Sequence, residues 1–118
     1  MEKRQGQIWN VDCNPNKGSE PGKIRPCLIV QTDALNYNNP ESYICVPLTT
    51  HVQEDSLIRE NVKKGLSGLT KDSTAIIDQL TAFDKSRFIK VLGKGGKLPK
   101  STVGAILKKI NLLFTSLD

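Results

Sequence analysis

The sequence predicts a single mainly β domain with helices (α+β) over residues 1–118, built from five to seven short strands and one long C-terminal helix. Two observations predict this class. The apolar runs are at most four residues long and are separated by segments rich in Gly, Pro and Asn, which is typical of short strands joined by loops. The C-terminal segment instead repeats its apolar residues at the period of a helix. We therefore expect a strongly bent sheet or small barrel with a helix packed on it.

The predicted strands cover residues 7–12, 25–32, 42–49, 57–62, 73–83 and 88–93. The second of these is continuous in its apolar residues and is expected to be a central strand. Pro47 interrupts the third, so we expect that strand to reach an edge or a bulge there. Residues 33–40 are rich in asparagine and predict a loop with one helical turn.

The C-terminal helix is predicted to begin at residues 98–101, with Pro99 in its first turn. The stripe expected to pack on the sheet consists of Val103, Ile106, Leu107, Ile110, Leu113, Phe114 and Leu117. Lys100, Lys108 and Lys109 lie off this stripe and are expected to face water. The glycine-rich residues 93–97 do not form a phosphate-loop motif, because no Ser or Thr follows the lysine, and we interpret them as a connection.

The positive charge is concentrated in the second half of the chain. Residues 1–59 hold six basic and seven acidic side chains, a net charge of −1, whereas residues 60–118 hold eleven and five, a net charge of +6. The basic second half predicts a surface for an anionic partner, either a nucleic acid or an acidic protein segment. The alternative is that its lysines form only the solvated face of a helix. The aromatic share is 5%, too low for a stacking platform, so RNA would be held mainly through phosphates and loops.

Cysteine and histidine usage argues against disulfides and against a conventional zinc site. Cys13, Cys27 and Cys45 are odd in number and form no CxxC pair, and two of them fall inside apolar runs, so buried free thiols are expected. His51 is the single histidine, and we expect neither a metal nor another cofactor. The chain starts without the apolar segment of a signal peptide and has no run that could span a bilayer, which predicts a cytoplasmic protein away from membranes.

The stretch 18–32 is the strongest candidate for a site, because a polar loop runs there directly into a buried strand. Gly18 and Gly22 allow close backbone approach to a ligand, and Pro26 suits the first position of the strand. Arg25 stands at the junction, with Glu20 five residues before it. The alternative is a surface loop whose charges are merely solvated.

Several motifs follow one another in a specific order and spacing: GSEPGKIRPCLIV at 18–30, VPLTT at 46–50, IDQL at 77–80 and FDKSR at 83–87. Together they make the chain similar, over nearly its whole length, to the MazF/PemK family of toxins from bacterial toxin–antitoxin pairs. The resemblance implies an SH3-like small barrel of the CcdB/MazF type with a C-terminal helix. It further implies a homodimer that cuts single-stranded RNA at a short sequence, uses no metal, and is neutralised by a cognate antitoxin with an acidic tail.

By the same resemblance, Arg25 and Thr49 are the catalytic pair, and Glu20 is the candidate for moving a proton or aiming the guanidinium. In a metal-free ribonuclease the 2′-hydroxyl of the RNA attacks the adjacent phosphorus and leaves a 2′,3′-cyclic phosphate and a 5′-hydroxyl. A guanidinium suits the charge that grows on the phosphoryl oxygens. The residues expected to line the RNA groove are Ser19, Gly22, Lys23, Thr50, Leu57, Asp78 and Gln79. Family members in which the aspartate is implicated in catalysis carry a basic residue where this chain has Ile76, which argues against a base role for Asp78.

Two other functions remain open at this point. A CcdB-like relative on the same scaffold would poison DNA gyrase by binding and would have no nuclease activity, and a third possibility is a non-catalytic RNA-binding barrel. The combination of Arg25-Pro26 with Thr49 favours the nuclease.

Overall fold

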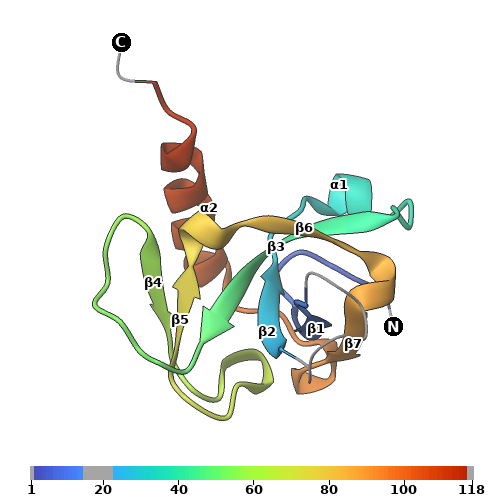
Figure 1. Cartoon of the computed structure of the whole chain (residues 1–118), viewed down its shortest axis with the longest axis horizontal. Helices are drawn as coiled ribbons and strands as arrows, with labels where there is room; N and C mark the ends of the chain where they lie inside the picture. Colours follow the sequence, from blue (N-terminus) through green and yellow to red (C-terminus); the bar gives the residue numbers. More distant parts are fainter. Residues whose placement is uncertain (1, 15–22, 117–118) are drawn as a thin grey trace.

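The computed structural model describes residues 2–14 and 23–116 and shows a seven-stranded antiparallel sheet with a long helix packed against it (Figure 1). The strands and helices are β1 (Ile8–Asp12), β2 (Ile24–Ile29), α1 (Asp33–Asn36), β3 (Ser42–Thr49), β4 (Arg59–Val62), β5 (Ser73–Ile76), β6 (Thr81–Asp84), β7 (Phe88–Val91) and α2 (Lys100–Leu113). Short 3-10 turns lie at η1 (Leu66–Gly68), η2 (Ile77–Gln79), η3 (Lys85–Arg87) and η4 (Gly93–Gly95). The strand order is β4-β5-β3-β2-β1-β7, with β6 paired to β3. The predicted class, mainly β with a C-terminal helix, is confirmed.

Strand β3 is shared by the two parts of the sheet. One of its edges pairs with β2, while its other edge pairs with β6 as far as Cys45 and with β5 from Leu48 onwards. Pro47 stands where the partner changes, and a residue without a backbone N–H fits a position where a ladder is interrupted. The interruption predicted at Pro47 is this change of partner.

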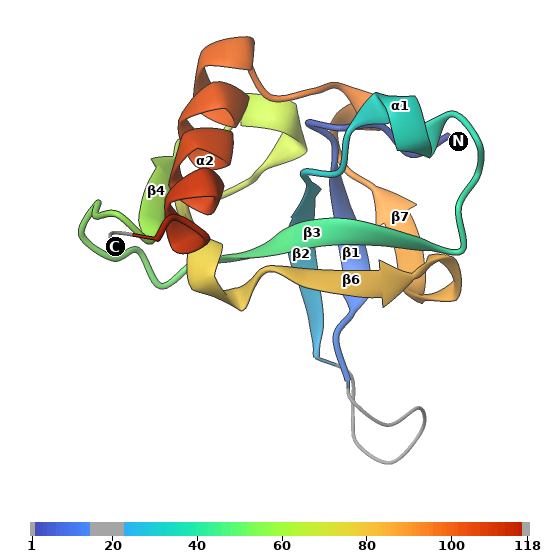
Figure 2. The same ribbon diagram turned by 90° about the horizontal axis from the view of Figure 1, so that it is seen from above.

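The central strands bury side chains on both faces, because apolar residues occupy successive positions along them. One face carries Ile8, Leu28 and Leu48 into a core that includes Ile106 of α2. The other face forms a second cluster, made up of Trp9, Val11, Cys27, Ile29, Tyr43 and Cys45. Figure 2 shows α2 beside β4 at one end of the sheet, with β6 lying along β3. The second cluster is therefore covered from the β6–β7 side and not by α2.

Lys3 closes the aromatic part of this second cluster. Its ammonium nitrogen lies 4.9 Å from the ring centroid of Trp9, 5.5 Å from that of Tyr43 and 5.4 Å from that of Phe88. The rings of Trp9 and Tyr43 each meet Phe88 edge to face. A cation over aromatic faces is attracted by the negative potential of each ring, so Lys3 holds the N-terminal segment against the sheet.

The single strand predicted over residues 73–83 is wrong: the chain forms β5, turns through η2 and continues as β6. β5 buries four consecutive residues and η2 begins with the buried Ile77, so burial alone does not distinguish the strand from the turn. The backbone N–H of Ile77 donates to Ile58 at 3.0 Å, while Asp78 and Gln79 turn outward.

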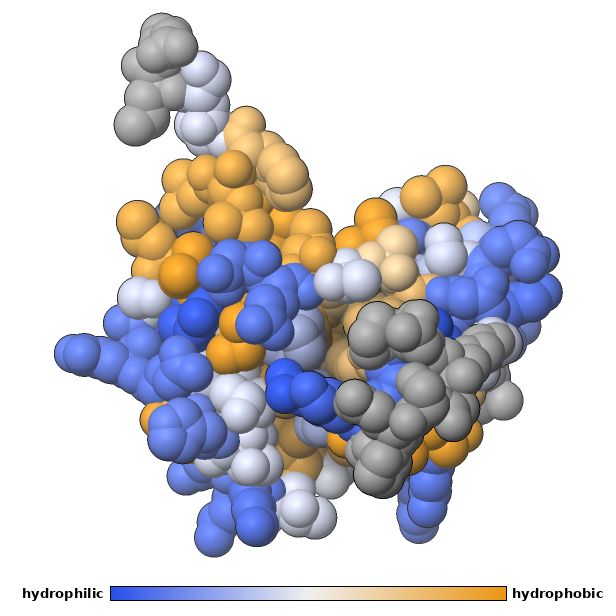
Figure 3. All heavy atoms as spheres, viewed as in Figure 1, coloured by the Kyte–Doolittle hydropathy of each residue, from blue (hydrophilic) through white to orange (hydrophobic). Residues whose placement is uncertain are grey.

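The apolar stripe of α2 packs as predicted only over its first part. Ile106 is fully buried, and Val103, Leu107 and Ile110 pack around it. Phe114 is 74% exposed, and Figure 3 shows apolar side chains gathered at this end of the helix. Leu117 lies outside the described residues. The sheet ends before the last turn of the helix and leaves it uncovered.

The expectation that Lys109 faces water is wrong, whereas Lys100 and Lys108 are exposed as predicted. The Lys109 side chain is only 16% exposed, and its ammonium bonds Glu60 at 2.7 Å and Asp55 at 2.8 Å. It also donates to the carbonyl of Arg59 at 2.9 Å. This lysine therefore fastens α2 to β4.

Among the described residues no helix is long and apolar enough to cross a membrane.

Candidate nucleic-acid interface

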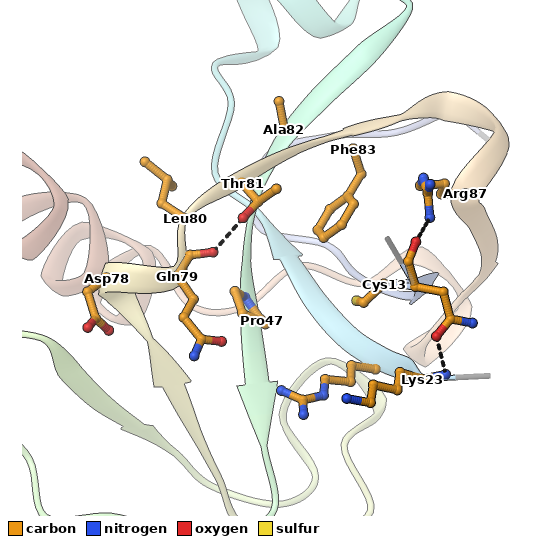
Figure 4. A pocket seen from close by; sticks show the side chains of 12 residues that line it. Cys13, Lys23, Pro47, Asp78, Gln79, Leu80, Thr81, Ala82, Phe83 and Arg87 are labelled. Carbon is orange, nitrogen blue, oxygen red and sulfur yellow. Dashed lines mark hydrogen bonds between the residues drawn. The ribbon is translucent and has the colours of Figure 1, made fainter. Parts of the chain in front are cut away.

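A groove of about 620 Å³ opens at the end of the second cluster, between the ends of β1 and β2 and the segment from η2 to β6 (Figure 4). Its lining residues are Cys13, Asn14, Lys23, Arg25, Pro47, Asp78, Gln79, Leu80, Thr81, Ala82, Phe83 and Arg87. Polar and charged side chains thus surround an apolar floor of Pro47, Leu80 and Phe83. A groove of this kind fits a ligand that combines charge with flat apolar surface.

Arg25 is exposed in the groove and is held by its strand. It pairs with Val11 of β1 and precedes by two residues Cys27, which pairs with Pro47 of β3. The pairing of β2 with β3 ends at Cys27 and Pro47, and Arg25 and Thr49 each lie two residues beyond that end. Among the described residues, none accepts a hydrogen bond or salt bridge from the Arg25 guanidinium. With respect to residues 2–14 and 23–116, the guanidinium donors are therefore available to an anionic ligand.

Thr49 ends β3 and is partly buried. Its hydroxyl oxygen accepts a hydrogen bond from the backbone N–H of His51 at 3.1 Å, and its backbone pairs with Thr74 of β5. The hydroxyl hydrogen remains available to donate to a phosphoryl oxygen. Thr49 is not among the groove-lining residues, and it lies two residues beyond the end of the pairing between β3 and β2.

Three of the predicted RNA-binding residues line the groove: Lys23, Asp78 and Gln79. Asp78 is anchored by Arg59, whose guanidinium nitrogen lies 2.6 Å from the carboxylate. The same guanidinium also donates to Gln53 at 2.7 Å. The Asp78 carboxylate is therefore neutralised by a fixed partner, which makes it a hydrogen-bond acceptor at the rim and not an isolated negative charge.

The other predicted residues lie elsewhere. Thr50 lines a smaller hollow of about 380 Å³ together with Pro26 and Lys71, and Leu57 is 69% exposed and lines neither cavity. Ser19, Glu20 and Gly22 fall outside the described residues. The structure therefore brings together Lys23, Arg25, Asp78 and Gln79, whereas Thr49 does not line this groove.

Sequence reasoning gave no role to Arg87 and Asn14, which organise one wall of the groove. The Arg87 guanidinium donates to the carbonyls of Asp12 and Asn14, and the Asn14 side-chain oxygen accepts from the backbone N–H of Lys23 at 3.2 Å. Figure 4 shows the contacts of Asn14 with Arg87 and with Lys23. Arg87 closes the FDKSR motif, so its position was visible in the sequence, but its use of carbonyl acceptors depends on the fold.

Two cysteines meet beside Arg25. The sulfur of Cys13, in the groove wall, lies 3.9 Å from that of the buried Cys27. The hydrogen bond from Cys27, helped by the positive charge of Arg25, lowers the pKa of Cys13 to about 7. The same hydrogen bond, together with burial, raises the pKa of Cys27, and burial raises that of Cys45.

Of the groups in residues 2–14 and 23–116, no three metal-binding side chains lie close enough together to hold a metal ion.

Comparison with known proteins adds to this geometry. The family model of the PemK-like, MazF-like toxin of type II toxin–antitoxin systems matches residues 4–114. A curated relative, Endoribonuclease MazF of Staphylococcus saprophyticus, is 32% identical over 85 residues, which cover 71% of this chain and 70% of the relative.

Solved structures share the fold at lower identity. A MazE–MazF complex from Deinococcus radiodurans aligns with a TM-score of 0.74 and 20% identity over 98% of this chain and 99% of the other. An endoribonuclease in complex with its cognate antitoxin from Mycobacterial species aligns with a TM-score of 0.73 and 17% identity, covering 97% and 98%. The predicted CcdB/MazF-like architecture is therefore confirmed.

Proposed function

The chain belongs to the PemK-like, MazF-like family of toxins of type II toxin–antitoxin systems, and from this premise we propose that it is an endoribonuclease that cuts single-stranded RNA in the groove at Arg25. The observation that carries the proposal is the exposed Arg25 guanidinium, which lines the groove together with Lys23. An RNA strand has a phosphate for the guanidinium and base faces for the apolar floor.

The cleavage proceeds by attack of the RNA's own 2′-hydroxyl. The bond from the 2′-oxygen to phosphorus forms, the bond from phosphorus to the 5′-oxygen breaks, and the leaving oxygen takes a proton. The products are a 2′,3′-cyclic phosphate and a 5′-hydroxyl. Arg25 donates to the phosphoryl oxygens as their negative charge grows, and Thr49 adds one hydroxyl donor. No step of this scheme uses a metal ion.

The remaining groove residues position the strand. Lys23 attracts the phosphate backbone, and Gln79 offers an amide that can read a base edge. Asp78, held by Arg59, accepts hydrogen bonds from base or ribose groups. Glu20 stays the candidate for proton transfer on sequence grounds, because it is the carboxylate nearest to Arg25 along the chain.

The proposed partners are a cognate antitoxin and a second copy of this chain. The net charge of +5 and the cationic groove fit an acidic antitoxin tail, which would compete with RNA for the same site. The solved structures of a mycobacterial endoribonuclease in complex with its cognate antitoxin and of the MazE–MazF complex from Deinococcus radiodurans support this proposal. Binding of intact antitoxin and RNA to one protomer at the same time would contradict it, and sedimentation of the purified protein tests the homodimer. The proposed site of action is the cytoplasm.

The decisive experiment incubates the purified full-length protein with a long RNA in EDTA. We expect discrete fragments with 5′-hydroxyl ends, which accept a labelled phosphate from a kinase without prior dephosphorylation. Intact RNA would overturn the proposal: RNA bound but uncut indicates a non-catalytic binding barrel, and inhibition of DNA gyrase without RNA cleavage indicates a CcdB-like toxin. A substrate with 2′-deoxyribose at the cleaved nucleotide should bind and stay intact.

A matched set of variants separates Arg25 from general charge effects. Arg25→Ala should lower the cleavage rate by about a hundredfold to a thousandfold, the loss typical of removing one transition-state donor. Arg25→Lys should recover only part of this rate, because an ammonium lacks the planar fork. Lys108→Ala, on the exposed face of α2, is the control and should cut RNA at the parent rate.

A further inference from the structure

Cys13 and Cys27 form a pair of thiols that the RNA chemistry above does not use. Their sulfur atoms lie 3.9 Å apart, one in the groove wall and the other fully buried beneath it. The Cys27 thiol also lies 3.7 Å from the carbonyl oxygen of Arg25, and the Cys13 sulfur 3.5 Å from that of Val11. An accessible sulfur in contact with a buried sulfur has the arrangement of an attacking thiol and a resolving thiol.

The surroundings of Cys13 favour its thiolate. Arg25 lies beside it as a fixed positive charge, and Cys27 can donate its S–H to the sulfur anion. With a pKa of about 7, roughly half of Cys13 is ionised at neutral pH. Cys27 and Cys45 remain protonated because they are buried. The three cysteines therefore differ sharply in reactivity, and only Cys13 opens to the groove.

We propose that Cys13 and Cys27 form an oxidisable thiol site whose substrate is a peroxide. The Cys13 thiolate attacks one peroxide oxygen, the O–O bond breaks, and Cys13 becomes a sulfenic acid while hydroxide leaves. The Cys27 sulfur then attacks the Cys13 sulfur, a disulfide forms, and the sulfenic hydroxyl leaves as water. Together the two thiols and one hydrogen peroxide give one disulfide and two waters. The sulfur atoms must approach from 3.9 Å to about 2.05 Å. Because Cys27 is paired with Trp9 and Cys13 lies beyond the end of β1, the backbone at the end of β1 must move as the disulfide forms.

The disulfide would change the groove at Arg25. It removes the Cys27 thiol from the Arg25 carbonyl, ties the end of β1 to β2, and draws the Cys13 side chain out of the groove wall. Oxidation is therefore expected to lower RNA cleavage, and reduction should restore it. This consequence rests on the proposed function, whereas the oxidation chemistry itself does not.

The chemical test treats full-length protein with hydrogen peroxide and maps the cross-link by mass spectrometry. Lys17 and Lys23 separate Cys13 from Cys27, and Glu41 separates Cys27 from Cys45, so digestion with trypsin and a glutamate-specific protease isolates each cysteine. We expect a Cys13–Cys27 cross-link in the parent protein and in the control Cys45→Ala. Three free thiols, or a cross-link to Cys45, would overturn the proposal.

Two variants separate the steps. Cys27→Ala should stop at the sulfenic acid, which dimedone traps on Cys13, and Cys13→Ser should remove the reaction with peroxide. At pH 7, iodoacetamide should alkylate Cys13 about tenfold faster than a free cysteine of ordinary pKa, which checks reactivity without any cross-link. Equal oxidation of Cys13→Ser and parent would contradict the assignment of Cys13.

The activity test keeps the two proposals apart. Oxidised parent protein should cut RNA at least tenfold more slowly than reduced protein, and a thiol reductant should restore the rate. Cys13→Ser should keep its rate in peroxide. If reduced protein does not cut RNA at all, the nuclease proposal fails while the cross-link still stands. If the cross-link forms and the rate of RNA cleavage is unchanged, the proposed effect of the disulfide on the groove is wrong.

Discussion

Gly68 lies so close to Gly93 that a Cβ atom on Gly68 would fall 2.2 Å from the backbone nitrogen of Gly93. Both glycines have positive φ, and their contact joins the turns η1 and η4. We expect Gly68→Ala to lower the free energy of unfolding by about 3 kcal/mol or more, because it combines strain with a backbone clash. Urea denaturation measures this change.

Two other glycines provide controls for this prediction. Gly65 has a φ of +88° but open space around it, so Gly65→Ala should cost only about 1–2 kcal/mol. Gly104 lies within α2 with nothing near its Cβ position, so Gly104→Ala should stabilise the protein by about 0.5–1 kcal/mol. Equal losses for Gly68→Ala and Gly65→Ala would show that the contact with Gly93 contributes nothing.

Lys109 provides a second test of stability. Its ammonium and the Glu60 carboxylate are largely shielded from water, so Lys109→Met leaves a poorly solvated carboxylate without its partner. We expect a loss of about 2 kcal/mol in the free energy of unfolding. Lys108→Met, one residue away and exposed, should change it by less than about 0.5 kcal/mol. Similar free energies of unfolding for both variants would show that Lys109 does not stabilise the contact between α2 and β4.

The contribution of Lys109 should also depend on pH. The hydrogen bond from Lys109 lowers the pKa of Asp55, and this part of the stability is lost as pH falls through the folded pKa. Partial burial lowers the pKa of Lys109, but the hydrogen bonds to Asp55 and Glu60 outweigh it and raise the pKa. The stability that Lys109 contributes is therefore lost as pH rises through its pKa in the folded protein. The difference between parent and Lys109→Met should be largest between about pH 5 and 9. A difference that stays constant down to pH 3 would argue against this linkage.

Trp9 reports on the N-terminal segment, because it is the single tryptophan of the chain and Lys3 lies over its ring. Lys3→Met keeps the aliphatic packing but removes the cation, so we expect a loss of about 1 kcal/mol and a change in tryptophan fluorescence of the folded protein. Lys3→Arg should retain most of the stability. Identical fluorescence and stability for parent and Lys3→Met would exclude a contribution from the cation.

Lys23 should contribute to RNA binding through charge alone. With an RNA that carries 2′-deoxyribose at the cleaved nucleotide, Lys23→Ala should weaken binding and reduce the dependence of log affinity on log salt by about 0.7, the value for one phosphate contact on a single strand. Lys108→Ala should leave the slope unchanged. A Lys23→Ala variant with the parent slope would remove Lys23 from the proposed interface.

The sequence predicted the strands best where local pattern and tertiary contacts agree. Residues 42–49 form β3 with the predicted bounds, and burial alternates along the strand only over its first four residues. Residues 73–83 were predicted as one strand because their apolar content is high, but the chain turns at η2 between β5 and β6. β5 and β6 pair with different stretches of β3, so the turn depends on tertiary pairing that apolar content does not encode.

The site was predictable to the extent that it follows strand ends. Arg25 and Lys23 meet Asp78 and Gln79 in the groove because their segments end on the same side of the sheet. The partners of Lys109 lie 49 and 54 residues away in sequence, and Cys13 and Cys27 meet across β1 and β2. Contacts of this kind depend on packing between elements, which periodicity and residue spacing do not encode.

The exchange of partners along β3 has a consequence for how the protein opens. Val46 and Leu48 contribute to the core under α2, while Pro47, between them, lines the groove on the opposite face. Native-state hydrogen exchange of the Val46 and Leu48 amides should therefore require global unfolding and not local fraying. We expect proteolytic cleavage and loss of the groove both to depend on the free energy of global unfolding. A variant selected only for resistance to heat should therefore also keep its groove folded for longer.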